Sequence, residues 1–256
     1  MTISDTIRLV RVRTAVTTDD ESLTTIGNEP DVVAACRRWR RAFRYSAIAF
    51  PATVLTLPDA ANWIRAHRCE VDAHSPQGIA FAMSASIPLK RVMFHCANAT
   101  DRTITDALDA GIGQFIVDSE SRAVKLGACA VEPLPVLVDV TDLQSGAVTA
   151  LSTLRASGSS RAVRAEEYLD LAGVYREAGT PEDAVLPALE IMAELRVRDH
   201  ILPSRLAVAL HPECSTSPES LADALSDAVE EGCARYRLPR PALTVFPDWT
   251  ALTHGV

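Results

Sequence analysis

The chain of 256 residues is 48% hydrophobic, 23% charged and only 5% aromatic, and its formal net charge is −8. These values exclude a collagen, a coiled coil and a disordered chain, and they suit one large globular domain. The acidic balance argues against non-specific nucleic-acid binding, which depends on a basic field.

The start of the chain is polar and irregular, and we assign residues 1–30 to an N-terminal extension. It lacks the charged-then-apolar order of a signal peptide, and no apolar run in the chain is long enough to cross a bilayer. The six cysteines are scattered without a CxxC pair, which predicts reduced thiols rather than disulfides or a zinc ribbon. We therefore expect a soluble, cytoplasmic protein with no membrane contact.

An amphipathic helix is expected next. Its apolar stripe is formed by Val32, Cys36, Trp39 and Phe43. The arginines between residues 37 and 44 could form an RNA-binding patch, but we interpret them as the solvated face of this helix. Nucleic acid is not an expected partner.

From there to the C-terminus, short β-rich runs alternate with segments of helical period, at the spacing of βα units. The predicted strands are Tyr45–Phe50, Glu70–Ala73, Val92–His95, Gln114–Asp118, Pro135–Val140, Tyr168–Val174, Leu206–Leu210 and Leu243–Phe246. The segment from Thr141 to Ala165 is rich in Ser, Ala and Gly and has no assigned element.

Several helices between these strands have clear start signals. Ser75, Thr180 and Ser217 each precede a proline, which suits an N-cap followed by the first helical position. Thr100 caps a further helix, and Gly111 is placed to end it.

Eight strands alternating with helices most simply close into a single (β/α)8 TIM-type barrel, an α/β fold, over residues 31–256. The competing arrangement is an open doubly wound sheet, which needs a G-x-G-x-x-G loop after an early strand. Here the first strand is followed by Pro51-Ala52-Thr53-Val54, and Gly111-Ile112-Gly113 precedes a strand. We predict one barrel and no second domain.

Four segments then match, in order, the strand motifs of a known family. The motifs Y-A-x-K-A-N, G-x-D-V-x-S-x-G-E, R-I-x-F-x-G-x-x-K and V-D-S-x-x-E-L fall on residues 45–50, 71–78, 91–98 and 117–123. From about residue 23 onward the chain resembles the barrel domain of the fold-type III pyridoxal-phosphate decarboxylases, the diaminopimelate and ornithine decarboxylase family with an alanine-racemase-like barrel. The resemblance implies the same barrel fold.

The resemblance also implies that the cofactor site is degenerate. The family's lysine falls on Ile48, its stacking histidine on Glu177 and its phosphate-binding hydroxyl on Thr180. Its glycine loop falls on Ala209, Leu210 and His211, its pyridine-binding glutamate on Phe246 and its phosphate-binding arginine on Trp249. Pyridoxal phosphate needs a lysine Schiff base to act as an electron sink, so we expect cofactor binding to be lost. The family's C-terminal β-domain, which completes the site across a dimer, is also not expected.

Polar residues nevertheless cluster at the predicted carboxyl ends of the strands, the barrel face where active sites lie. The pocket candidates are Asp72, His74, His95, Glu177, His211 and Asp248, with Cys96, Asp118, Glu213 and Cys214 nearby in the sequence. A metal held by His74, His95 and His211 is conceivable, but each histidine is more often structural, so we expect no metal. Asp72 and Asp118 have an alternative role in capping the next helix.

These observations leave three hypotheses for the function. The first is a pseudoenzyme that acts as a binding or regulatory partner in amino-acid or specialised metabolism, its partner being an active decarboxylase-like relative or a second copy. The second is an enzyme independent of pyridoxal phosphate, acting on an amino-acid-like substrate with or without a metal. The third is a small-ligand sensor. If Ile48, Phe50, Phe246 and Trp249 plug the barrel mouth, the enzyme hypothesis loses support.

Overall fold

The computed structural model describes residues 29–97, 99–142, 169–211, 217–248 and 252. The predicted N-terminal extension, Glu213, Cys214 and Trp249 lie outside these residues, apart from the last two positions of the extension. The five cysteines among the described residues are all free, as the sequence predicts. No helix in the described part of the chain is long and apolar enough to span a membrane.

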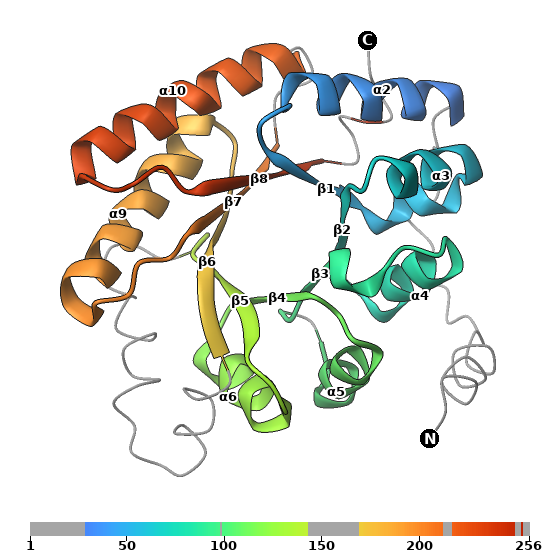
Figure 1. Ribbon diagram of the computed structural model, residues 1–256, viewed down its shortest axis with the longest axis horizontal. Coiled ribbons are helices and arrows are strands. Elements are labelled where there is room, and N and C mark those ends of the chain that lie inside the picture. The colour runs from blue at the N-terminus through green and yellow to red at the C-terminus, as the bar shows by residue number, and fades with distance from the viewer. Residues whose placement is uncertain (1–28, 98, 143–168, 212–216, 249–251, 253–256) are drawn as a thin grey trace.

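Eight parallel strands pair in chain order, and β1 pairs with β8 to close the barrel (Figure 1). They are β1 (Ala47–Pro51), β2 (Glu70–Ala73), β3 (Val92–His95), β4 (Gln114–Val117), β5 (Leu134–Asp139), β6 (Leu169–Ala178), β7 (Arg205–Leu210) and β8 (Ala242–Pro247). The single (β/α)8 TIM-type barrel is confirmed, because an open sheet has no pairing between its first and last strands.

Two predicted strand bounds were wrong by more than one residue. Tyr45 precedes β1 and is 93% exposed, whereas the predicted strand began there. β6 continues to Ala178 instead of ending at Val174, because it pairs with β7 along its whole second half. The longer strand places Glu177 on β6 rather than in a loop.

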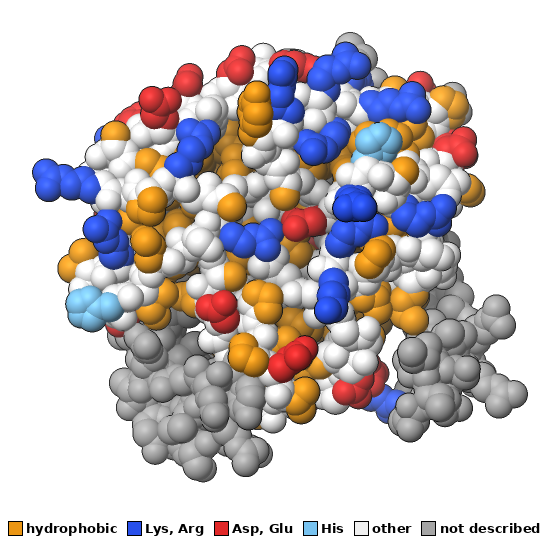
Figure 2. All heavy atoms as spheres, in the orientation of Figure 1, with side chains coloured by type: hydrophobic (Ala, Val, Ile, Leu, Met, Phe, Trp, Pro, Cys, Tyr) orange, Lys and Arg blue, Asp and Glu red, His pale blue; other side chains and the backbone are white. Residues whose placement is uncertain are grey.

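Helices surround the barrel on the outside (Figure 1). They are α2 (Glu29–Ala42), α3 (Pro58–Ala66), α4 (Pro76–Ser84), α5 (Asp101–Ala110), α6 (Glu120–Cys129), α9 (Pro181–Asp199) and α10 (Pro218–Tyr236), with the short 3-10 helices η1 (Ala52–Thr56) and η2 (Leu89–Arg91). The predicted apolar stripe of α2 is buried at Val32, Cys36 and Trp39. On the face seen in Figure 2, basic and acidic side chains both occur across the described surface.

The predicted helix starts are confirmed. The hydroxyl groups of Ser75, Thr100, Thr180 and Ser217 each accept a hydrogen bond from the backbone N–H three residues later. Gly111 ends α5 in the left-handed conformation, with φ of 83°.

Replacing Thr180 with alanine should lower the free energy of unfolding by ~1 kcal/mol, because the cap of α9 is lost. The Thr180 hydroxyl accepts from the Asp183 N–H at 3.2 Å and donates to the Asp183 carboxylate at 2.8 Å. Urea unfolding measures the change. Thr180→Ser keeps the hydroxyl and should unfold like the unchanged protein, and an equal loss in both variants would contradict the cap.

The buried side chains form two separate cores. The barrel interior is filled by Ala49, Met93, Ile116, Leu137, Tyr175, Ala207, Ala209 and Phe246. The second core lies between the strands and the helices, and it includes Ile48 and Phe50 of β1. Successive side chains of a strand point to opposite faces, so in β1 it is Ala49 that points into the barrel and Ile48 that points towards the helices.

Candidate functional site

Two histidines and an aspartate meet at the carboxyl ends of β2 and β3. Asp72 lies on β2, His74 follows that strand directly, and His95 is the last residue of β3. His74 Nε2 donates to Asp72 Oδ2 at 2.8 Å, and His95 Nε2 lies 2.9 Å from Asp72 Oδ1. The two imidazole rings are stacked, with centroids 3.8 Å apart and planes 15° apart.

Asp72 is the fixed negative charge of this group. Burial opposes ionisation of its carboxyl, but the two histidines outweigh that effect and lower the Asp72 pKa to about 2. Burial likewise opposes protonation of His74, yet the hydrogen bond to Asp72 and the charges of Asp72 and Glu177 raise the His74 pKa. Asp72 is therefore not the cap of α4, a role that Ser75 fills.

Aromatic side chains form the floor beneath His95. The rings of Tyr175 and His95 are nearly perpendicular, with their centroids 5.0 Å apart. Phe246 and His95 are arranged in the same way, with their centroids 6.3 Å apart. Burial, followed by the charges of Asp72 and Glu177, raises the pKa of Tyr175 far above its ordinary value. Its hydroxyl stays protonated and donates to Glu177 Oε2 at 3.5 Å.

A second polar group lies at the ends of β6, β7 and β8. Glu177 Oε1 is 2.8 Å from His211 Nε2, and Asp248 Oδ2 is 3.5 Å from His211 Nδ1. The His211 and Glu177 side chains are about half exposed, at 47% and 46%. The imidazole is thus oriented by a carboxylate on each side.

All six pocket candidates from the sequence therefore fall into two groups, with Tyr175 between them. Tyr175 was missed, although it lies two residues before Glu177 on β6, a spacing that places both side chains on the same strand face.

Asp118 joins neither group and accepts a hydrogen bond from the exposed Ser119 hydroxyl. Burial raises the pKa of Cys96 to about 12, so this thiol is not an activated nucleophile.

The positions at which the resemblance places the family's cofactor contacts are dispersed. Ile48 and Leu210 pack in the core between strands and helices, whereas Ala209 and Phe246 pack inside the barrel. Ile48 and Phe50 do not plug the barrel mouth, because both side chains pack in the core between the strands and the helices. The hydroxyl of Thr180 is engaged in the cap of α9.

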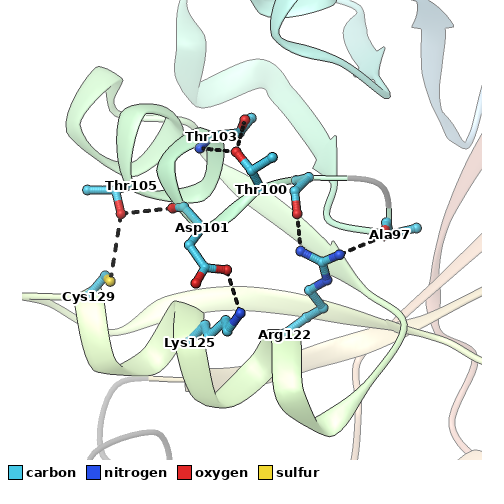
Figure 3. Close-up of polar contacts among 9 residues, drawn as sticks. Ala97, Thr100, Asp101, Thr103, Thr105, Arg122, Lys125 and Cys129 are labelled. Carbon is cyan, nitrogen blue, oxygen red and sulfur yellow. Dashed lines mark hydrogen bonds and ion pairs between the residues drawn. The ribbon is translucent and has the colours of Figure 1, made fainter.

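Lysine is scarce in this chain. The whole sequence contains two, Lys90 and Lys125. Lys90 lies in η2, before the amino end of β3, and is exposed. Lys125 lies on α6 and pairs with Asp101 of α5, with its Nζ 2.5 Å from the carboxylate (Figure 3). Neither amine belongs to the polar groups at the strand ends.

Arginines near the strand ends are bound to backbone carbonyls. Arg122 donates to the carbonyls of Ala97 and Ala99 (Figure 3), and Arg176 donates to those of Val140 and Asp183. The two polar groups at the strand ends consist instead of carboxylates and imidazoles, joined by the Tyr175 hydroxyl. A phosphate ester held by donors and positive charge does not fit this set, and neither does a lysine-bound aldehyde.

A shallow hollow on the outer surface lies between α9 and α10. It is lined by Glu190, Ala193, Glu194, Val197, Arg198 and Tyr236. It shares no residue with either polar group, so the candidate chemistry lies at the strand ends.

Comparison with known proteins gives a consistent set of similarities. Residues 29–159 match the model of the pyridoxal-dependent decarboxylases, in its pyridoxal binding domain. A diaminopimelate decarboxylase from Actinosynnema pretiosum subsp. auranticum is 32% identical over 114 residues, which are 44% of this chain and 26% of that protein. The enzyme of the same name from Mycobacterium tuberculosis is 30% identical over 106 residues, which are 41% of this chain and 24% of that protein.

Solved structures share the barrel. The diaminopimelate decarboxylase from M. jannaschii in complex with L-lysine superposes with a TM-score of 0.67 at 18% identity, covering 88% of this chain and 60% of that one. The lysine/ornithine decarboxylase from Vibrio vulnificus in complex with putrescine gives 0.68 at 15% identity, covering 96% and 68%. At this identity the likeness concerns the fold. The matched segments span about a quarter of the curated relatives' length.

Proposed function

The chain belongs to the pyridoxal-dependent decarboxylase family, and from that premise we propose that it is a non-catalytic member, which does not use pyridoxal phosphate and acts as a binding or regulatory partner in amino-acid metabolism. The observation that carries the proposal is the position of its two lysines. Lys90 lies at the amino side of β3 and Lys125 on the helical layer. Without an amine at the strand carboxyl ends no Schiff base can form there.

The charges at the barrel mouth support the same proposal. Asp72, Glu177 and Asp248 are carboxylates whose described partners are histidines and a tyrosine. They would repel the phosphate of the cofactor rather than hold it.

A lysine-free variant tests the proposal directly. Lys90→Arg with Lys125→Arg removes every lysine while keeping both surface charges, so we expect it to fold and behave like the unchanged protein. The lysine-free variant and the unchanged protein should both release no CO₂ from diaminopimelate, lysine or ornithine in the presence of pyridoxal phosphate. Borohydride reduction followed by peptide mass spectrometry should find no stoichiometric adduct.

An active diaminopimelate decarboxylase provides the matched control for assay and reduction. Cofactor-dependent CO₂ release that disappears in the lysine-free variant would overturn the proposal. A single stoichiometric lysine adduct would do the same.

A second candidate function is an enzyme that works without pyridoxal phosphate on an amino-acid-like substrate. It is favoured by the His211 imidazole, which lies between the carboxylates of Glu177 and Asp248 in the geometry of an oriented acid–base group. Turnover without the cofactor, retained in the lysine-free variant and lost in His211→Gln, would select this candidate over the first.

The regulatory role needs a protein partner, and we infer an active decarboxylase-like relative, with a second copy of the chain as the other candidate. The 30–32% identity to diaminopimelate decarboxylases supports the choice of relative. Light scattering of the purified chain, alone and mixed with such an enzyme from the same cell, distinguishes the two assemblies.

A further inference from the structure

Asp72, His74 and His95 present three metal-ligand atoms at one place. The ligand atoms, one from each side chain, lie within 4.8 Å of one another. The barrel register brings them together: Ala73 of β2 pairs with Phe94 of β3, so His74 and His95 are neighbours one position further along. Asp72 lies two residues before His74 and so points to the same face.

Two buried atoms in this group have only each other as a partner. Asp72 Oδ1 and His95 Nε2 are 2.9 Å apart and form an ion pair, and neither atom has a further hydrogen bond in the described structure. Both side chains are more than nine-tenths buried, with 9% and 8% exposed. Because Asp72 Oδ1 and His95 Nε2 face only each other, an ion placed between them would break no further hydrogen bond of either atom.

We propose that Asp72, His74 and His95 bind one divalent transition-metal ion, with Zn²⁺ as the reference ligand. Two imidazoles and one carboxylate are a ligand set suited to first-row metals rather than to Mg²⁺ or Ca²⁺. Three protein ligands leave a coordination position for water or a small ligand. The nearby carboxylate of Glu177 adds negative charge that favours a cation.

The exposure of the three residues gives the site a closed side and an open side. His95 is fixed from below by the edges of Tyr175 and Phe246, whereas the His74 side chain is 61% exposed. Because the two rings are nearly parallel, a shared ion requires His74 to turn about its side-chain bonds so that both Nε2 atoms point at one centre. The exposed residue is the one free to do so.

The ligand set differs from the one conceived from the sequence. His211 was grouped with His74 and His95, but its two ring nitrogens face Glu177 and Asp248. Asp72 takes the third position. His211 therefore serves as the matched control, since it is another half-exposed histidine at the same end of the barrel.

Metal titration of the chelator-treated full chain tests the proposal. Equilibrium dialysis with Zn²⁺ should give one ion per chain, and Co²⁺ should give visible absorption with the same stoichiometry. His74→Gln should weaken binding at least ~10-fold, since even outer-shell changes cost 10–100-fold in affinity. His211→Gln should bind like the unchanged protein. His74 is exposed, so the variant is expected to fold, and circular dichroism checks this.

Absence of stoichiometric Zn²⁺ and Co²⁺ binding would overturn the proposal, and so would binding that His74→Gln leaves unchanged. An equal loss in His211→Gln would overturn the assigned ligand set. Asp72→Asn is an independent test of the ligand set. It removes the negative charge while keeping the side-chain shape, so it should also weaken Zn²⁺ binding. The metal site can be tested separately from the proposed function. The lysine-free variant that tests the proposed function retains all three ligands, so either proposal can fail without the other.

Discussion

Replacing Ile48 with lysine is expected to cost the protein about 4 kcal/mol of stability and to restore no cofactor binding, because a buried apolar side chain is exchanged for a charge. Sequence matching places the family's lysine at this position, so the substitution is the obvious attempt at repair. Ile48 is 2% exposed, however, and packs in the core between the strands and the helices. The new amine would point away from the barrel interior and would have to be buried without a partner.

Urea unfolding and borohydride trapping with pyridoxal phosphate measure the two halves of this prediction. Ile48→Val is the control for packing alone and should cost ~1 kcal/mol. An Ile48→Lys variant with unchanged stability and a stoichiometric reducible adduct at residue 48 would contradict the placement of this side chain.

Local signals in the sequence were sufficient for the order and bounds of many elements. β2 and β3 have the predicted bounds. The N-caps at Ser75, Thr100, Thr180 and Ser217 were predictable because a hydroxyl before a helix has a local function. Closure of the barrel followed from the number and alternation of the elements.

The direction of a side chain in a barrel strand is harder to predict. A parallel strand covered on both faces is apolar throughout, so the alternation that marks an inner and an outer face is absent. In β1 both Ile48 and Ala49 are buried, and only the pairing with β2 and β8 decides which points inward. A match of letters to a family motif therefore gave the position of Ile48 along the strand, but not its face.

The same limit applies to contacts between distant strands. The pairing of His211 with Glu177 and Asp248 depends on the relative heights of three strand ends, which no local pattern encodes. The sequence identified all three residues as candidates, but it did not separate them from the group around Asp72.

A polar network at the opposite end of the barrel was not predicted at all. Arg205, the first residue of β7, donates to Gln114 Oε1 at 2.9 Å, to Glu70 Oε1 at 3.3 Å and to Thr244 Oγ1 at 3.1 Å. Gln114 and Thr244 are buried, and the Arg205 and Glu70 side chains are about a quarter exposed. One guanidinium thus joins β2, β4, β7 and β8, and it closes the amino end of the interior.

Replacing Arg205 with methionine should lower the free energy of unfolding by about 3 kcal/mol near neutral pH, because it leaves the Glu70 charge without its partner. Burial raises the pKa of Glu70, and Arg205 opposes that rise. Removing the arginine should raise the Glu70 pKa further, so protonation then favours the folded state more strongly. In the variant, the stabilisation that comes from protonation of Glu70 is therefore fully present below the ordinary glutamate pKa of about 4.3. This contribution is lost as the pH rises through the pKa of Glu70 in the folded protein.

The loss caused by Arg205→Met should consequently be smaller at about pH 5 than at about pH 8, as measured by urea unfolding at both values. Glu70→Gln combined with Arg205→Met removes the unpaired charge, so the double variant should recover part of the loss at about pH 8 and should lose the pH dependence. A loss that is equal at both pH values, or equal in the single and double variants, would mean that packing of the arginine stem, rather than its charge, stabilises this end of the barrel.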